Sequence, residues 1–162
     1  MTPASAPRRS AAEQARLESA LTELIEHHIS FNAVLGIKVL SLTPGDVRCG
    51  LTMKPELVGH SAYGRLHGGV TSSVLDVVGA LALMVEASAR HPGDSAAQVM
   101  ARFNKMGTID LRVDFLRQGI GREFLATAEV TRLGGRVGST LMRLTNESGE
   151  VISTGAASYI VS

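Results

Sequence analysis

One carboxylate lies inside the most apolar segment of the chain and is the first candidate for chemistry. Asp76 falls within the run 69–89, GVTSSVLDVVGALALMVEASA, which is apolar on most of its circumference when wound as a helix. Because burying an unpaired carboxylate costs several kcal/mol, we expect Asp76 to have a partner or a function there. Two structural alternatives stay open: a solvent-filled gap beside Ser72, Ser73 and Gly79, or an ion pair with an arginine.

The tripeptide His67-Gly68-Gly69 leads into this helix and is suited to hold an oxygen that gains negative charge. Glycines at a helix start let a ligand approach the main chain, and the first-turn amides carry partial positive charge. Gly68 and Asp76 are two helical turns apart, about 12 Å along the axis, so they cannot hold the same atom within one subunit. Asp76 of a partner subunit would close that gap.

Two arginines and two histidines are further candidates for ligand contacts. Arg132 and Arg136 flank the Gly134-Gly135 turn and suit a phosphorylated ligand, although charges at a hairpin end are commonly only solvated. His60 and His67 lack the cysteine or second-ligand pattern of zinc sites, so we expect no metal. No serine stands in a G-x-S-x-G turn, so a serine hydrolase is not supported.

The elements that must position these residues follow an α+β order. Ser10 and Glu13 match a capping box and open an amphipathic helix over 11–29. A hairpin of strands 36–42 and 46–53 follows, then a glycine-containing loop over 54–66 and the buried helix over 69–89. Four long strands complete the chain: 108–115, 122–133, 136–145 and 150–161. We expect one antiparallel sheet covering one central helix, in a single domain over 10–162 after a disordered tail, 1–9.

Charge and composition exclude several partners. With a formal net charge of +1, the chain lacks the basic excess that nucleic-acid binding requires. The longest apolar run, 74–85, is interrupted by Asp76 and is too short to span a bilayer. Cys49 has no second thiol for a disulfide, and the N-terminus lacks a signal-peptide core, so we expect a cytoplasmic protein.

Two segments, RLHGGVTSSVLDVVGALALM and MGTIDLRVDFLRQG, resemble the PaaI-like branch of the hotdog-fold acyl-CoA thioesterases. The similarity runs over 31–162 and is greatest to the YigI-like members, which implies medium or long acyl chains. The resemblance implies a hotdog fold, with a long helix wrapped by a curved antiparallel sheet. It also implies a homodimer that joins its two sheets and holds the active sites at the interface, with a tetramer left open.

The resemblance also implies roles for individual residues. Asp76 corresponds to the general base or nucleophile, Gly68 to the amide that polarises the thioester carbonyl, and Thr108 to the hydroxyl that positions water, with His67 beside them. The substrate is acyl-CoA, and no metal or bound cofactor is required. Family members often carry an asparagine before HGG, for which His60 or Ser61 would substitute here. The expected substrate-binding residues are Gly69, His60, Ser61, Ser72, Arg132 and Arg136.

Two rival functions remain from the sequence. Hotdog hydratases and dehydratases use a loop histidine and a helix carboxylate, and this chain has His67 and Asp76. A non-catalytic acyl-CoA-binding protein is the other alternative, because the family asparagine is missing. Retention of a carboxylate in an apolar helix argues against a pure binder, which would gain stability from an apolar residue at position 76.

Overall fold

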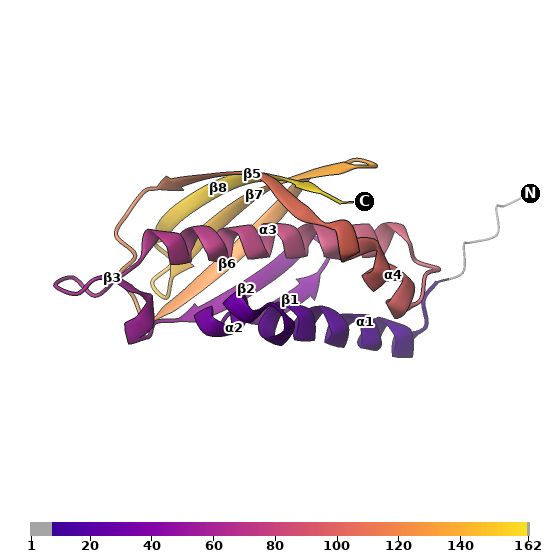
Figure 1. Ribbon diagram of the computed structural model, residues 1–162, viewed down its shortest axis with the longest axis horizontal. Helices are drawn as coiled ribbons and strands as arrows, with labels where there is room; N and C mark the ends of the chain where they lie inside the picture. The colour runs from indigo at the N-terminus through magenta and orange to yellow at the C-terminus, as the bar shows by residue number, and fades with distance from the viewer. Residues whose placement is uncertain (1–7, 162) are drawn as a thin grey trace, which may run out of the picture.

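The computed structural model describes residues 8–161. A long helix, α3 (Gly68–Arg90), lies along one face of a six-stranded antiparallel sheet (Figure 1). In spatial order the strands are β1 (Lys38–Thr43), β2 (Asp46–Thr52), β6 (Glu123–Leu133), β7 (Val137–Asn146), β8 (Val151–Ile160) and β5 (Gly107–Phe115). The arrangement confirms the expected hotdog fold, in which one sheet wraps one central helix.

The central helix forms the core because it is apolar on nearly every side. Val74, Leu75, Val78 and Leu81 are fully buried. They pack against the inward-facing side chains of the sheet, whose strands alternate buried and partly exposed residues. The helix begins one residue earlier and ends one residue later than the sequence predicts, a difference within the usual uncertainty of helix ends.

Two glycines allow α3 to lie close to the sheet. A Cβ atom at Gly79 would overlap the Tyr159 hydroxyl and lie 2.8 Å from Thr140 Oγ1. A Cβ at Gly138, on β7, would lie 2.6 Å from Leu83 Cδ2. These distances are too short for real contacts, so the glycines set the separation between the helix and the sheet.

The first predicted helix is present but changes its winding. An α-helix, α1 (Ala11–Glu23), continues as a π-helical turn, η1 (Leu24–His28), and then as a short helix, α2 (Ser30–Leu35). Ser10 caps α1 as expected by accepting the Glu13 amide hydrogen at 3.2 Å. The Glu13 carboxylate does not complete the predicted capping box; it accepts instead from the Ala96 amide at 2.9 Å.

The region predicted as the loop 54–66 contains regular structure. It holds a 3₁₀ turn, η2 (Pro55–Leu57), and a small hairpin of β3 (Val58–His60) and β4 (Arg65–Leu66). The turn of this hairpin extends beyond the start of α3 (Figure 1). Its strands are too short to show a sequence period, which is why the prediction missed them.

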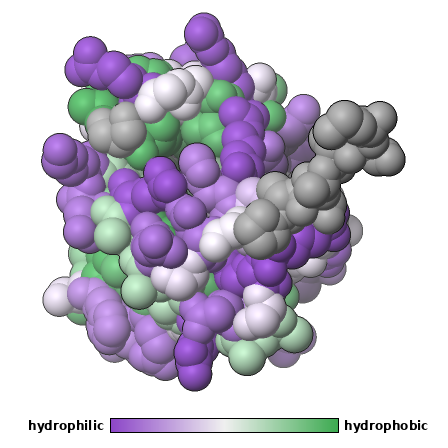
Figure 2. Space-filling view, turned by 90° about the vertical axis from the view of Figure 1, so that its right-hand side faces the viewer, coloured by the Kyte–Doolittle hydropathy of each residue, from purple (hydrophilic) through white to green (hydrophobic). Residues whose placement is uncertain are grey.

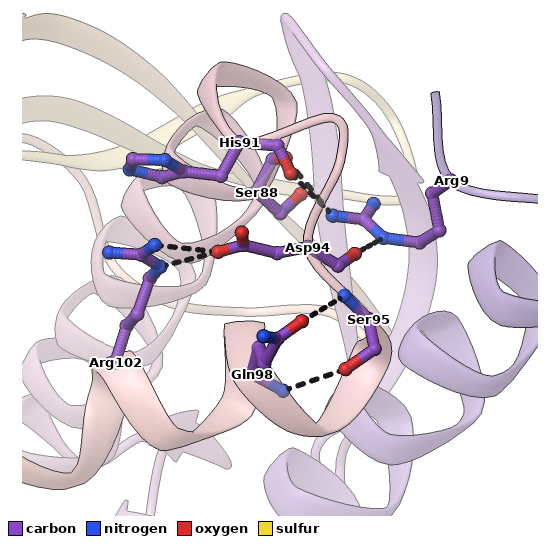
Figure 3. A network of polar contacts seen from close by, with 7 residues as sticks. All are labelled: Arg9, Ser88, His91, Asp94, Ser95, Gln98 and Arg102. Carbon is purple, nitrogen blue, oxygen red and sulfur yellow. Dashed lines mark hydrogen bonds and ion pairs between the residues drawn. The ribbon is translucent and has the colours of Figure 1, made fainter. Parts of the chain in front are cut away.

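A further helix, α4 (Ala96–Arg102), follows α3 and continues as η3 (Phe103–Lys105); neither was predicted. Ser95 and Gln98 form a capping box at its start. The Arg9 guanidinium reaches the same turn and donates to the carbonyls of Asp94 (2.8 Å), His91 (3.1 Å) and Ser88 (3.3 Å), as Figure 3 shows. Arg9 therefore ties the start of the described chain to the end of α3, whereas residues 1–7 of the predicted tail lie outside the described residues.

The hydropathy of the central helix differs from that of one outer face of the molecule. α3 has the length and hydropathy of a membrane-crossing helix, at 23 residues and a mean hydropathy of 1.7, yet 61% of its apolar window is buried. Burial of this kind is typical of the core helix of a folded domain. The end of the molecule where α3 terminates is mainly hydrophilic, with small hydrophobic areas (Figure 2).

Candidate active site

The carboxylate of Asp76 lies in the N-terminal half of α3, two turns after its start, beside the first residues of β5. Thr108 Oγ1 donates a 2.9 Å hydrogen bond to Asp76 Oδ1. The other oxygen, Oδ2, has no hydrogen-bond partner within residues 8–161, and Asp76 is only partly buried. No arginine of the described chain contacts this carboxylate, so Asp76 has no ion pair within its own subunit. One oxygen is fixed by Thr108, and the other is left for a water or a substrate.

The main chain at the start of α3 presents one free donor. His67 is the N-cap residue, and its Nδ1 atom accepts the Gly69 amide hydrogen at 2.9 Å. The Gly68 amide, in the first turn, has no acceptor within the described residues. Since a histidine that accepts at Nδ1 carries its proton at Nε2, His67 also offers an Nε2–H donor. The helix start therefore offers two N–H groups, the Gly68 amide and His67 Nε2–H, to an acceptor outside the described chain.

A groove of about 570 Å³ opens at this helix start. Its walls include Gly68, Thr71, Phe115 and Arg117, with Leu66 at its base. The ring of Phe115, at the end of β5, lies 3.4 Å from the position of a Cβ on Gly68. A Cβ at position 68 would therefore touch the ring at about the van der Waals distance, and glycine leaves this space open beside the helix amide.

The remaining predicted site residues do not gather at this groove. His60 stacks against Tyr63 with ring centroids 4.9 Å apart, and Ser61 is exposed in the same hairpin turn. Ser72 Oγ donates to the Gly68 carbonyl at 2.9 Å, so its hydroxyl hydrogen is used within the helix. Gly69 is exposed beside His67.

Arg132 and Arg136 lie at the opposite end of the helix. The β6–β7 turn that carries them is attached to the last residue of α3, because Arg90 Nη1 donates to the Leu133 carbonyl at 2.7 Å. The helix is 23 residues long, about 34 Å, so these arginines are remote from Gly68 of the same chain. The structure thus divides the predicted site among the start, middle and end of α3.

Two aromatic residues of the site were missed by the sequence analysis. Phe115 walls the groove, and Tyr159 Oη donates to the main-chain carbonyl of Asp76 at 3.0 Å. Tyr159 is fully buried on β8, opposite Thr108 on β5. The only signal for Tyr159 is its place as the one aromatic side chain in the otherwise small-residue run 153–159.

The side chains of types that could bind a metal do not form a cluster. Across residues 8–161, no three histidine, cysteine or acidic side chains lie close enough together to hold an ion. The single thiol, Cys49, is fully buried on β2, and burial raises its pKa to about 12. It is neither a ligand nor a nucleophile at neutral pH.

The hotdog fold and the comparisons with known proteins identify a thioester hydrolase. The family model of the thioesterase superfamily matches residues 63–153, a range that holds His67, Gly68, Asp76 and Thr108. The chain belongs to the thioesterase superfamily.

Individual relatives agree with this assignment. The medium/long-chain acyl-CoA thioesterase YigI of Salmonella typhimurium is 36% identical over 139 residues, 86% of this chain and 90% of that protein. Human acyl-coenzyme A thioesterase 13 is 30% identical over 129 residues, 78% of this chain and 81% of that protein. A Shewanella oneidensis crystal structure related to the thioesterase superfamily is 36% identical and superposes with a TM-score of 0.87, covering 95% of this chain and all of that one.

Proposed function

We propose that this chain hydrolyses medium- to long-chain acyl-CoA thioesters, with Asp76 as base or nucleophile and the Gly68 amide as oxyanion donor. The observation that carries the proposal is the Asp76 carboxylate, with Oδ1 bound to Thr108 Oγ1 and Oδ2 free. Such a group can take a proton from water or attack a carbonyl. The acyl-CoA substrate is suggested by the names of two relatives, a medium/long-chain acyl-CoA thioesterase and an acyl-coenzyme A thioesterase.

The proposed reaction balances with water alone. In the base route, Asp76 accepts a proton from water, and the hydroxide attacks the thioester carbonyl. The Gly68 amide stabilises the tetrahedral oxyanion, the C–S bond breaks, and the proton returns to the thiolate of coenzyme A. In the nucleophile route, Oδ2 attacks the thioester carbonyl, and the C–S bond breaks to release the coenzyme A thiolate and leave a mixed anhydride. Water then hydrolyses the anhydride to the free acid and the Asp76 carboxylate, and the proton released from water goes to the thiolate. Neither route needs a metal or a bound cofactor.

A homodimer would bring the two halves of the site together. The outer edge of β5 pairs with no other described strand, so its main-chain groups are free to bind a second copy. In an antiparallel pair of β5 strands, the start of one lies opposite the end of the other. Thr108 stands at the start of β5 beside Asp76, and Phe115 at its end beside Gly68. Such pairing would carry Asp76 toward the partner's Gly68.

The missing family asparagine leaves room for a second donor to the carbonyl. His60 ends β3 and Ser61 follows it in the β3–β4 turn, while His67 offers its Nε2–H from the N-cap position. We propose that one of these three supplements the Gly68 amide. Arg132 and Arg136 of the subunit that supplies Asp76 would contact phosphate groups of coenzyme A. Ser72 and Gly69 would contact the part of the substrate next to the thioester.

The capping role of His67 argues against the hydratase alternative. A hydratase base needs a free lone pair on a ring nitrogen, but Nδ1 of His67 accepts the Gly69 amide hydrogen and Nε2 carries the proton. A thioesterase needs only a donor at this position.

Cytoplasmic location stays part of the proposal and rests on the single, buried Cys49 thiol.

Release of free thiol from a panel of acyl-CoAs tests the function. We expect Asp76→Ala and Asp76→Asn to lower kcat by about 10²–10⁴-fold. Glu86→Gln is the matched control, because it removes a carboxylate from the same helix, one paired only with Arg90. Equal rates for the wild type and Asp76→Ala on every chain length would exclude hydrolysis by this carboxylate. Loss of absorbance of an enoyl-CoA without thiol release would indicate the hydratase.

A further inference from the structure

Thr108 and Tyr159 are directly opposite each other on the neighbouring strands β5 and β8. Both residues donate a hydrogen bond to Asp76, but to different atoms of it. Thr108 Oγ1 donates to the carboxylate at 2.9 Å, and Tyr159 Oη donates to the main-chain carbonyl of the same residue at 3.0 Å. A single cross-strand pair therefore fixes Asp76 by its side chain and by its backbone.

The bond from Tyr159 is unusual because a mid-helix carbonyl already serves as an acceptor within the helix. The hydroxyl reaches it only because position 79, on the next turn, has no side chain. A Cβ atom there would overlap Tyr159 Oη and would lie 2.8 Å from Thr140 Oγ1 and 3.1 Å from Met142 Sδ. Gly79 thus makes the space into which the phenol points.

Tyr159 is a dependable donor at this position. Its side chain is fully buried. Burial, together with the negative charge of nearby Asp76, raises the pKa of the phenol well above its usual range. The hydroxyl therefore keeps its proton over the whole range in which an enzyme of this kind would be assayed.

We infer that Tyr159 is a positioning residue for the reaction: with Thr108, it holds the Asp76 turn of α3 at a fixed height above the sheet and so sets where the free Oδ2 meets the thioester. This inference rests on the proposed function. The backbone of Asp76 is rigid because it belongs to a helix, but the whole helix can slide or rotate along the sheet. Small displacements are costly, since a misplacement of about 1 Å can reduce a rate by about a hundredfold.

Tyr159→Phe tests the inference because it removes the hydroxyl and keeps the ring in the core. We expect kcat to fall by about ten- to a hundredfold with KM changed by less than about threefold, since substrate contacts are retained. Ile37→Val is the control: it trims a buried side chain just before β1, which lies at the opposite edge of the sheet from β5, and we expect kcat to stay at the wild-type value. Gly79→Ala is a second route to the same defect, because its methyl group displaces the hydroxyl while Tyr159 is retained.

Two readouts separate positioning from a general loss of stability. In the Asp76→Ala background, Tyr159→Phe should lower the residual rate no further, because its effect passes through Asp76. Independently of activity, the carboxyl ¹³C resonance of Asp76, assigned by its absence in Asp76→Asn, should shift in Tyr159→Phe and in Gly79→Ala but not in Ile37→Val. An unshifted resonance, or full kcat in folded Tyr159→Phe, would overturn the inference. If Asp76→Ala itself stayed fully active, the proposed function would fail while the resonance test still reported on the positioning of Asp76.

Discussion

Thr108 Oγ1 lies 2.9 Å from Asp76 Oδ1 and donates a hydrogen bond to it across the interface between β5 and α3. These residues are 32 positions apart in the chain, and each belongs to a different layer of the fold. The bond orients the carboxylate and leaves its second oxygen free. It is the structural feature that turns a carboxylate in an apolar helix into a candidate catalytic group.

Removing the hydroxyl at this position should slow hydrolysis. A hydrogen bond to a charged group contributes about 1.5–3 kcal/mol, so Thr108→Val should reduce kcat by about ten- to a hundredfold. Thr108→Ser keeps the donor and should retain most of the rate. Steady-state kinetics with one acyl-CoA would check both variants. A Thr108→Val enzyme as fast as Thr108→Ser would show that the bond has no part in catalysis.

Mixing two inactive variants should restore activity if the site spans two subunits. Gly68→Pro removes the proposed oxyanion donor, and proline is tolerated at the first position of a helix. His67 has the extended backbone that a following proline requires, with ψ at 136°. A heterodimer of Gly68→Pro and Asp76→Ala would hold one intact composite site, so unfolding and refolding the mixture should recover about a quarter of the wild-type activity.

Each variant refolded alone is the control for this mixture and should stay inactive. A mixture that also stayed inactive, with heterodimers present by mass spectrometry, would show that Gly68 and Asp76 act within one chain. The experiment therefore tests the shared site directly, rather than the oligomeric state alone.

Cys49 should make the protein less stable in alkali. Its folded-state pKa is about 12, above the ordinary value of 9.0, because the thiol is buried. Above pH 9.0 the unfolded chain loses this proton while the folded chain keeps it, so the free energy of unfolding falls as pH rises. The slope approaches about 1.4 kcal/mol per pH unit for one group. Urea unfolding at a series of pH values between about 8 and about 10.5 should show a smaller fall in the free energy of unfolding with pH for Cys49→Ala than for the wild type.

The same burial predicts that Cys49 does not react with thiol reagents in the native state. Disulfide-based detection of free coenzyme A would then report substrate hydrolysis without a signal from the enzyme. Rapid labelling of the folded protein would contradict the burial of this thiol.

Arg9 should stabilise the end of α3. Its guanidinium donates to the carbonyls of Ser88, His91 and Asp94, in the last turn of the helix and in the turn that follows it. We expect Arg9→Ala to lower the free energy of unfolding by about 1–2 kcal/mol. Arg8→Ala removes the same charge from an exposed neighbour and should change it by less than about 0.5 kcal/mol. Chemical denaturation of both variants makes the comparison, and equal effects would mean that only net charge matters.

Much of the fold could be predicted because its elements carry strong local patterns. The alternation of TIDLRVDF predicts β5, and the apolar circumference of 69–89 predicts a helix that must be wrapped by protein. The turn chemistry of Thr43-Pro44-Gly45 predicts the first hairpin, and Gly45 indeed has φ +79°. Elements without a period of their own, such as α4 and the β3–β4 hairpin, were missed.

The candidate site could be predicted only in its parts. Asp76 and the His67-Gly68-Gly69 run stand out from the sequence because a buried charge and a glycine-rich helix start both need a reason. Their two-turn separation along α3 also follows from the sequence, because helix rise is fixed. Nothing in the sequence joins Tyr159 to Asp76, since a single buried tyrosine has no period and no motif.

The sequence by itself determined which residues could do chemistry and which segments become helix or strand, because both depend on residue type and local spacing. The tertiary structure alone decided that β5 pairs with β8 rather than β6, and that Thr108 and Tyr159 meet at Asp76. Strand order and the approach of a helix to a sheet depend on contacts between residues far apart in the chain. Packing of the whole core settles such contacts, and no local pattern encodes them.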